Sequence, residues 1–167
     1  EVGRILGLGV SGYLGSVLEI EAVAFPSSEK GKGAIRFNDT AGSMAKDSVA
    51  NAAAVFRSLT GKQLSDYDIH VNVVGGGNID GPSAGVAILA AIISAVWQVP
   101  LPQDIAVTGE LSIRGNVKPV GGLHPKVYGA RQAGVKKVFV PQDNWDEISE
   151  QAAEVEIVPI QTVAQFL

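Results

Sequence analysis

The chain has 167 residues, of which 46% are hydrophobic and 18% are charged, and it carries a formal net charge of −4 and no cysteine. This size and composition describe a globular chain with one well-buried core, and they exclude a disordered chain and a comfortable division into two domains. The lack of cysteine excludes disulfides, a catalytic thiolate and sulfur-ligated zinc, and the acidic balance argues against a general nucleic-acid-binding protein.

The first half of the chain contains mainly strand patterns. Apolar and β-branched residues alternate on both sides of a Ser11-Gly12-Tyr13 turn, which indicates a hairpin of two strands. Farther along, apolar residues recur at helical spacing as far as a stop signal at Thr60-Gly61. We therefore expect strands at 4–10, 15–25, 34–37 and 68–74 and a helix at 43–59.

The second half contains the longest apolar run, residues 84–97. Because this run is shorter than the roughly 20 residues that span a bilayer, it predicts a buried core helix at 86–96 and no membrane association. Since strands and helices interleave, we expect one compact domain of mixed α/β (α+β) class over residues 1–167. The remaining patterns predict strands at 105–108, 111–113, 117–119, 137–140 and 155–158, and helices from 123 or 126 to 132, at 145–152 and at 162–167.

The most informative motif is Asp80-Gly81-Pro82-Ser83-Ala84-Gly85, a tight loop that runs into the apolar helix. Gly81 and Gly85 permit backbone conformations that larger residues resist, and Pro82 stiffens the approach. The first N–H groups of the following helix have no partner within it, so they are suited to stabilise an oxyanion. Ser83 is therefore a candidate nucleophile, provided that another group removes its proton.

Two residues are candidates for that base. His124 and Lys126 both lie in Gly121-Gly122-Leu123-His124-Pro125-Lys126, which again combines flexible glycines, a proline and the start of a helix. A lysine acts as a base only where burial or a neighbouring cation lowers its pKa toward neutrality. A serine–lysine dyad is a known variant of the serine–histidine–aspartate triad, so the motif by itself leaves both bases open.

Several simpler or rival interpretations apply to these patterns. Taken alone, Ser83 would be a helix N-cap and Lys126 a surface lysine. Gly7-x-Gly9-x-x-Gly12 matches a dinucleotide fingerprint but lies between strand patterns, where that fingerprint requires a helix start. Gly81-x-Ser83-x-Gly85 matches the nucleophile elbow of α/β-hydrolases, and Ser43-x-x-Lys46 matches the first motif of penicillin-binding enzymes, but the partner motifs of both are missing or incomplete.

Together, the motifs resemble those of the proteolytic domain of the Lon protease family, and the resemblance covers nearly the whole chain. Residues 80–85 are similar to the family's serine motif, residues 121–126 to its lysine motif, and Thr108-Gly109-Glu110 between them also matches. The resemblance implies the Lon protease fold, which is related to the ribosomal protein S5 domain 2-like fold.

The same resemblance implies roles for individual residues. Ser83 would be the nucleophile, Lys126 the general base, and Thr108 a hydroxyl that orients the lysine amine. Asp80 would flank the site and be linked to its active or inactive loop conformation, with Gly81 and Pro82 supporting the serine.

The chain departs from the family pattern in two places. Pro125 stands where the family usually has a glutamate before the catalytic lysine. His70-Val71-Asn72 stands where the family often has His-x-His, so we expect Asn72 to replace a polar residue of the site wall. Neither change removes the nucleophile or the base. Pro125 is the main support for an alternative function, that of a non-catalytic assembly or scaffold domain with the same fold.

The resemblance also implies partners and a location. Lon proteases are ring-shaped oligomers, commonly hexamers, in which an ATPase module passes unfolded proteins to sequestered serine–lysine sites. This chain has no Gly-x-x-x-x-Gly-Lys-Ser/Thr phosphate loop, so ATP and Mg²⁺ are expected only through an upstream ATPase module of a longer chain, although some Lon-like peptidases work without ATP. We therefore expect a cytoplasmic serine endopeptidase that degrades unfolded or damaged proteins in protein quality control, uses no cofactor or metal of its own, and binds neither nucleic acid nor membrane.

Overall fold

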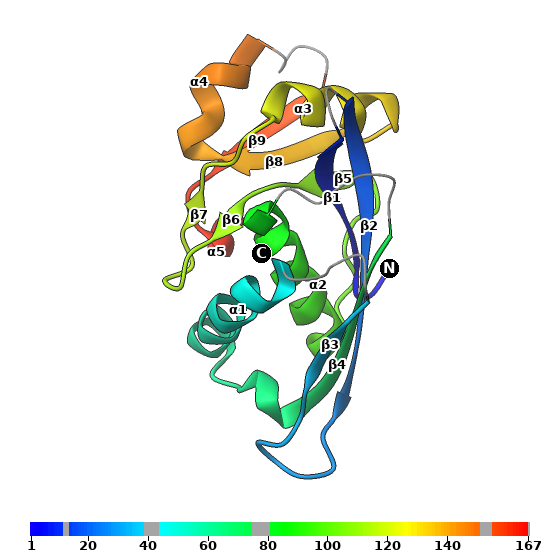
Figure 1. Ribbon diagram of the computed structural model, residues 1–167, viewed down its shortest axis with the longest axis vertical. Coiled ribbons are helices and arrows are strands. Elements are labelled where there is room, and N and C mark those ends of the chain that lie inside the picture. The colour runs from blue at the N-terminus through cyan, green and yellow to red at the C-terminus, as the bar shows by residue number, and fades with distance from the viewer. Residues whose placement is uncertain (12–13, 39–43, 75–80, 151–154, 167) are drawn as a thin grey trace.

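The computed structural model describes residues 1–11, 14–38, 44–74, 81–150 and 155–166. A twisted central sheet runs through the molecule, and helices cover both of its faces (Figure 1). Helices α1 (Met44–Thr60) and α2 (Gly85–Trp97) lie on one face, and α3 (Leu123–Gln132) lies on the other. This arrangement confirms the mixed α/β class that the interleaved patterns predict.

The central sheet has seven strands in the order β3-β4-β2-β1-β5-β8-β9. The β4–β2 and β2–β1 pairs are antiparallel and the remaining pairs are parallel. Pro159 lies in the edge strand β9, where a missing backbone N–H is tolerated. The strands are β1 (Arg4–Ser11), β2 (Leu14–Pro26), β3 (Ile35–Phe37), β4 (Tyr67–Val74), β5 (Ile105–Val107), β8 (Lys137–Pro141) and β9 (Glu156–Ile160).

Strands β1 and β2 form the predicted hairpin, with Gly7 opposite Leu18 and Gly9 opposite Ser16. Along β2, Leu18 and Ile20 are buried, whereas Glu19 between them is exposed. This alternation gives the sheet a buried side toward α2, because successive side chains of a strand point to opposite faces.

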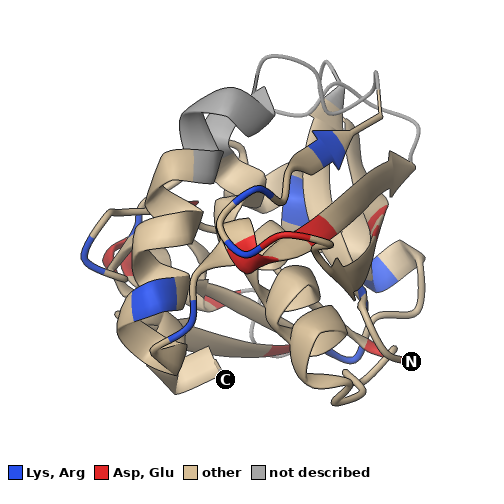
Figure 2. Ribbon diagram, turned by 90° about the horizontal axis from the view of Figure 1, so that it is seen from below, with Lys and Arg blue, Asp and Glu red and all other residues tan. Residues whose placement is uncertain are grey.

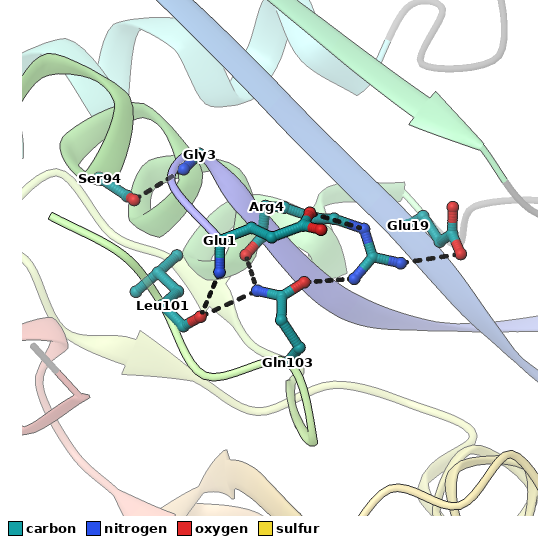
Figure 3. A network of polar contacts seen from close by, with 7 residues as sticks. All are labelled: Glu1, Gly3, Arg4, Glu19, Ser94, Leu101 and Gln103. Atoms are coloured by element: carbon teal, nitrogen blue, oxygen red, sulfur yellow. Dashed lines mark hydrogen bonds and ion pairs between the residues drawn. The ribbon is translucent and has the colours of Figure 1, made fainter. Parts of the chain in front are cut away.

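The start of β1 is tied to the loop that precedes β5 (Figure 3). The Arg4 guanidinium forms an ion pair with Glu19 (2.9 Å) and donates a hydrogen bond to the Gln103 side chain. The Gln103 amide in turn donates to the Arg4 carbonyl (3.0 Å). The backbone N–H of Gly3 donates to the hydroxyl of Ser94 in α2 (2.8 Å), which attaches the C-terminal half of that helix to the strand.

Helix α2 is the centre of the larger core. Every residue from Gly85 to Ala95 is buried, as expected for an apolar helix that packs between the sheet and α1. It ends at Gln98, whose left-handed backbone (φ 57°) lets its N–H donate to the Ser94 carbonyl. From α1, Ala52, Val55 and Phe56 complete this core. The predicted boundaries of both helices are confirmed to within one or two residues.

Helix α3 packs on the opposite face and builds a second, smaller core. Leu123, Val127 and Ala130 of the helix lie in one cluster with Leu8 of β1 and Val138 of β8. Helix α3 lies very close to β2 at Gly15. A Cβ on Gly15 would lie 1.8 Å from the carbonyl oxygen of Pro125 in α3. Only a glycine permits this approach of strand and helix.

The remaining elements are short. Strands β6 (Glu110–Leu111) and β7 (Val117–Lys118) form a separate antiparallel pair. Helix α4 (Trp145–Ile148) continues as 3₁₀ helix at 149–150, so the described part of the predicted helix at 145–152 is helical, and residues 151–152 lie outside the described part of the chain. The other short helices are α5 (Val163–Phe166), η1 (Leu64–Asp66), η2 (Gly81–Ala84) and η3 (Gln142–Asn144).

Candidate active site

Ser83 lies in the 3₁₀ turn η2, immediately before α2. The N-cap of α2 is Ala84 and no side chain caps it, so the interpretation of Ser83 as an N-cap is wrong. The serine is 4% exposed, and its hydroxyl has no hydrogen-bond partner among the residues that the structure describes. A buried hydroxyl without a partner costs about 1–3 kcal/mol, so its presence calls for a functional explanation.

The turn that follows β5 is hydrogen-bonded to the serine turn. The N–H of Gly109 donates to the Ser83 carbonyl (3.0 Å), and the N–H of Val86 donates to the Gly109 carbonyl (3.3 Å). The N–H of Thr108 donates to the Phe139 carbonyl in β8 (3.0 Å). These bonds join the Thr108–Gly109 turn to both the serine turn and the sheet. Because Val86 is engaged, the N–H groups available for an oxyanion lie nearer Ser83.

Thr108 follows the last residue of β5 and is completely buried. Its hydroxyl, like that of Ser83, is buried with no hydrogen-bond partner in the described part of the chain. Gly109 beside it fits a tight space, because a Cβ there would lie 2.6 Å from Cγ1 of Val117 and 3.3 Å from Cγ2 of Val86. The turn therefore brings a second buried hydroxyl to the segment that holds Ser83.

Lys126 lies near the start of α3 and is completely buried. Gly122, the N-cap of this helix, adopts a left-handed conformation (φ 67°), and its carbonyl accepts the N–H of Lys126 (3.0 Å). A Cβ on Gly122 would lie 4.0 Å from Cε of Lys126, so the lysine side chain runs past its own N-cap. Pro125 lies in the first turn, where a missing N–H breaks no helical hydrogen bond.

Both motifs lie at the same end of the β1–β2 hairpin. The lysine motif contacts that end directly, because Gly122 packs against Val10 and Gly15 against the backbone at Pro125. Helix α2 runs antiparallel to β1: Gly3 packs near Ala95 and Gly7 near Ala87. The serine end of α2 therefore points toward the same hairpin end as Lys126.

The other predicted site residues are placed as follows. The backbones of Gly81 and Pro82 belong to η2, and Asp80 lies outside the described residues. The expectation that Asn72 forms part of the site wall is wrong. Asn72 is exposed and pairs with Glu21 of β2, six residues or about 20 Å from Gly15 at the hairpin end that contacts the lysine motif.

The structure also bears on two rival motifs, the glycine pattern that begins at Gly7 and the Ser43-x-x-Lys46 pair. Gly7 and Gly9 lie inside β1, so the glycine pattern there does not open a helix, as the sequence analysis predicts. The rival pair begins at Ser43, which lies outside the described residues, as does the side chain of Lys46.

Sequence reasoning did not single out Ser16 of β2. Its hydroxyl is also buried with no hydrogen-bond partner among the described residues. No motif marks this serine, and the available signal was a polar residue at an inward-facing position of an alternating strand.

Within the described residues, no three His, Asp or Glu side chains are grouped as a metal ion would need, and no helix has the length and hydropathy of a membrane span. Figure 2 shows the Lys and Arg residues distributed over several elements, with Asp and Glu between them.

Comparisons with known proteins agree on one family. The family model described as "Lon protease (S16) C-terminal proteolytic domain" matches residues 1–167. The archaeal Lon protease of Thermococcus kodakarensis is 40% identical over 172 residues, covering 100% of this chain and 27% of the relative. That of Thermoplasma acidophilum is 42% identical over 177 residues, covering 99% of this chain and 27% of the relative. Lon protease 2 of Bacillus subtilis is 42% identical over 180 residues, covering 100% of this chain and 32% of the relative.

These relatives are much longer than the chain described here, which spans only about a third or less of their length. The similarity therefore extends over this entire chain but over a minor part of each relative.

Proposed function

The chain belongs to the family of Lon protease C-terminal proteolytic domains, and from that premise we propose that it hydrolyses peptide bonds with Ser83 as nucleophile and Lys126 as general base. The observation that carries this proposal is the complete burial of Lys126 at the hairpin end toward which the serine end of α2 points. A fully buried lysine is rare without a functional or structural reason.

The proposed reaction begins with proton transfer from Ser83 to Lys126. Desolvation of a buried lysine favours its neutral amine, which is the form that can accept a proton. As the Oγ–H bond breaks, Oγ of Ser83 bonds to the carbonyl carbon of the peptide, and the carbonyl oxygen becomes an oxyanion. Backbone N–H groups near Ser83 hold that oxyanion.

Two stages follow: the tetrahedral intermediate collapses to an ester with Ser83, and water then hydrolyses that ester. The C–N bond breaks, the Lys126 ammonium returns its proton to the leaving amine, and an ester with Ser83 remains. Water attacks this ester as Lys126 removes one of its protons, and the same proton returns to Oγ when the acid product leaves. The Thr108 hydroxyl orients the lysine amine during both stages.

We further propose that the substrates are unfolded or damaged proteins and that the active form is a homo-oligomeric ring, with a hexamer expected from the resemblance. ATP and Mg²⁺ would act only through an ATPase module of a longer parent protein in the cytoplasm. The greater length of the relatives is compatible with such a module.

A direct test compares the degradation of a fluorescently labelled, unfolded protein without ATP by the unmodified chain, Ser83→Ala and Lys126→Ala. Protein concentration and oligomeric state must be matched. Ser94→Ala and Lys136→Ala are suitable controls, because Ser94 is buried near the other end of α2 and Lys136 is exposed. We expect cleavage to be lost in the two dyad variants only.

The same preparations should be treated with a fluorophosphonate, and the modified residue identified by mass spectrometry. Labelling of Ser83 that disappears in Lys126→Ala supports the dyad. A folded chain that neither cleaves nor labels favours the scaffold function for which Pro125 is the main support. Full cleavage by Ser83→Ala would contradict the proposal.

A further inference from the structure

Ser16 carries a hydroxyl for which the described part of the chain provides no partner. It lies in β2 opposite Gly9 of β1, a residue with no side chain that could satisfy it. The oxygen is buried and makes no hydrogen bond to any residue that the structure describes. Only Ser83 and Thr108 carry other buried hydroxyls of this kind in the described ranges, and both belong to the proposed site. This similarity suggests that Ser16 serves the same site.

Strand alternation places the Ser16 side chain on the face of the sheet toward α2. Leu18 and Ile20 lie two and four residues farther along β2, and both belong to the core that contains α2. Since residues two apart in a strand share a face, Ser16 has the same orientation. Gly15 faces the other way, against Pro125 of α3.

Two contacts between β1 and α2 show which part of the helix lies level with Ser16 of the paired strand β2. Near one end, Gly3 packs against Ala95, beside its hydrogen bond to Ser94 (Figure 3). A Cβ on Gly7 would lie 3.7 Å from Cβ of Ala87. The four residues from Gly3 to Gly7 span about 13 Å of strand, and the eight residues from Ala95 to Ala87 span about 12 Å of helix. The two segments therefore lie alongside each other over nearly equal lengths.

Continuing along β1 past Gly7, and along the helix past Ala87, leads to Gly9 and to Ser83. Gly9 lies two residues beyond Gly7, about 7 Å farther along β1. The same distance is covered by the four residues from Ala87 back through the start of α2 to Ser83 in η2, at a rise of about 1.5 Å per residue in the α-helix and about 2 Å in the 3₁₀ turn. Ser16 is paired with Gly9, so its hydroxyl is level with Ser83 on the face where Ser83 lies. Gly15, the residue before Ser16, lies close to the lysine motif, because a Cβ on it would be 2.8 Å from the backbone nitrogen of Lys126.

We propose that Ser16 is a further substrate-binding residue of the site, whose hydroxyl forms a hydrogen bond with the main chain of the bound peptide beside Ser83. This inference rests on the proposed peptidase function. A peptide that reaches Ser83 brings N–H and C=O groups into a buried space, and a serine hydroxyl can donate to or accept from either. Binding of the peptide then supplies the partner that the described residues do not provide.

The test uses four variants of the chain: Ser16→Ala, Ser16→Thr, Ser16→Val and the control Ser94→Ala. Thr and Val have nearly the same shape, so that pair isolates the hydroxyl at constant side-chain volume. Ser94 is a matched control because its hydroxyl has partners, Gly3 and Val99, far from the site. The readouts are kcat/KM for a fluorogenic peptide, the rate of Ser83 labelling by a small fluorophosphonate, and Tm.

We expect kcat/KM to fall about three- to tenfold in Ser16→Ala and Ser16→Val, and to stay within about twofold of the unmodified chain in Ser16→Thr. Labelling by the fluorophosphonate, which has no peptide chain, should keep its unmodified rate in all three. The Tm of Ser16→Ala should be unchanged or higher, because the Ser16 hydroxyl makes no hydrogen bond to any described residue. Ser94→Ala should lower Tm and leave kcat/KM unchanged.

Other outcomes overturn the inference. If kcat/KM is unchanged in Ser16→Val, or if Ser16→Thr is impaired as much as Ser16→Val, the hydroxyl does not bind substrate. A parallel loss of labelling and peptide cleavage would make Ser16 a structural residue of the dyad. If the unmodified chain neither labels nor cleaves, the proposed function fails first, and that result is distinct from the others.

Discussion

The N–H of Gly109 donates a hydrogen bond to the carbonyl oxygen of Ser83 (3.0 Å), and so joins the turn after β5 to the turn before α2. The carbonyl of the same glycine accepts the N–H of Val86 (3.3 Å). Gly109 thus forms backbone hydrogen bonds with Ser83 itself and with Val86, three residues farther along the chain. The position of the Ser83 hydroxyl depends on how closely the Thr108–Gly109 turn can approach.

Replacing Gly109 with alanine should disturb the serine turn. The new Cβ would lie 2.6 Å from Cγ1 of Val117 and 3.3 Å from Cγ2 of Val86, so the turn must move away. Overpacking of this kind costs about 1–3 kcal/mol. We expect a lower Tm and at least a tenfold loss of peptide cleavage, measured by thermal unfolding and by initial rates. If the Gly109→Ala variant keeps the Tm and the rate of the unmodified chain, the turn can accommodate a Cβ and the prediction is wrong.

The two adjacent glycines of the lysine motif should respond differently to alanine. Gly122 has φ 67°, and a Cβ there would lie 2.8 Å from Cγ2 of Val10 and 4.0 Å from Cε of Lys126. Gly121 has no positive φ, and a Cβ there would meet nothing within 4 Å. We expect Gly122→Ala to lose about 1–3 kcal/mol of stability, together with most of its activity, and Gly121→Ala to change little.

This comparison is internally controlled, because both substitutions add one methyl group to the same motif. Chemical denaturation gives the free energy of unfolding, and peptide hydrolysis gives the rate. Equal effects at the two positions would contradict the assigned role of the left-handed N-cap.

The hydroxyl of Thr108 should matter for activity and not for stability. It is completely buried with no hydrogen-bond partner among the described residues, so Thr108→Val removes a polar atom at nearly constant shape. We expect an equal or higher Tm and a clear fall in kcat, because the lysine amine loses its orienting group. Thr108→Ser keeps the hydroxyl and should retain more activity than Thr108→Val. A Tm loss in Thr108→Val without an effect on kcat would indicate a structural hydroxyl.

Peptide cleavage should rise with pH. The proposed base is the neutral amine of Lys126, and the neutral fraction increases as pH rises through the pKa of the amine. Initial rates between about pH 6 and pH 9, corrected for any unfolding, measure this directly. Lys126→Arg should be inactive across the same range, because a guanidinium stays protonated. A flat profile for the unmodified chain would argue strongly against the base assignment.

Much of the fold could be predicted from local patterns. Alternation located the β1–β2 hairpin and β4, and the apolar run of α2 identified the central helix, because these signals arise from neighbours within one element. The predictions failed where distant segments decide the outcome. Asn72, which we expected in the site wall, is instead exposed and pairs with Glu21, far from the hairpin end that holds both motifs.

Local patterns also explain why only part of the site could be predicted. The motifs around Ser83 and Lys126 are local, so their residue types and spacing are visible in the chain. Ser16 belongs to no motif. We infer its level relative to Ser83 from the register of β1 with β2 and the packing of Gly7 against Ala87, neither of which a local pattern encodes.

The sequence by itself determined the family, the mixed α/β class and the candidate serine and lysine, because residue types, periodicity and motif spacing are properties of the chain. Only the tertiary structure decided that Lys126 is fully buried, that Gly109 is bonded to the serine turn, and that Ser16 is level with Ser83. The physical reason is that burial and hydrogen-bond partners depend on strand order, register and helix packing. Those contacts join residues far apart in the chain, and no local pattern encodes them.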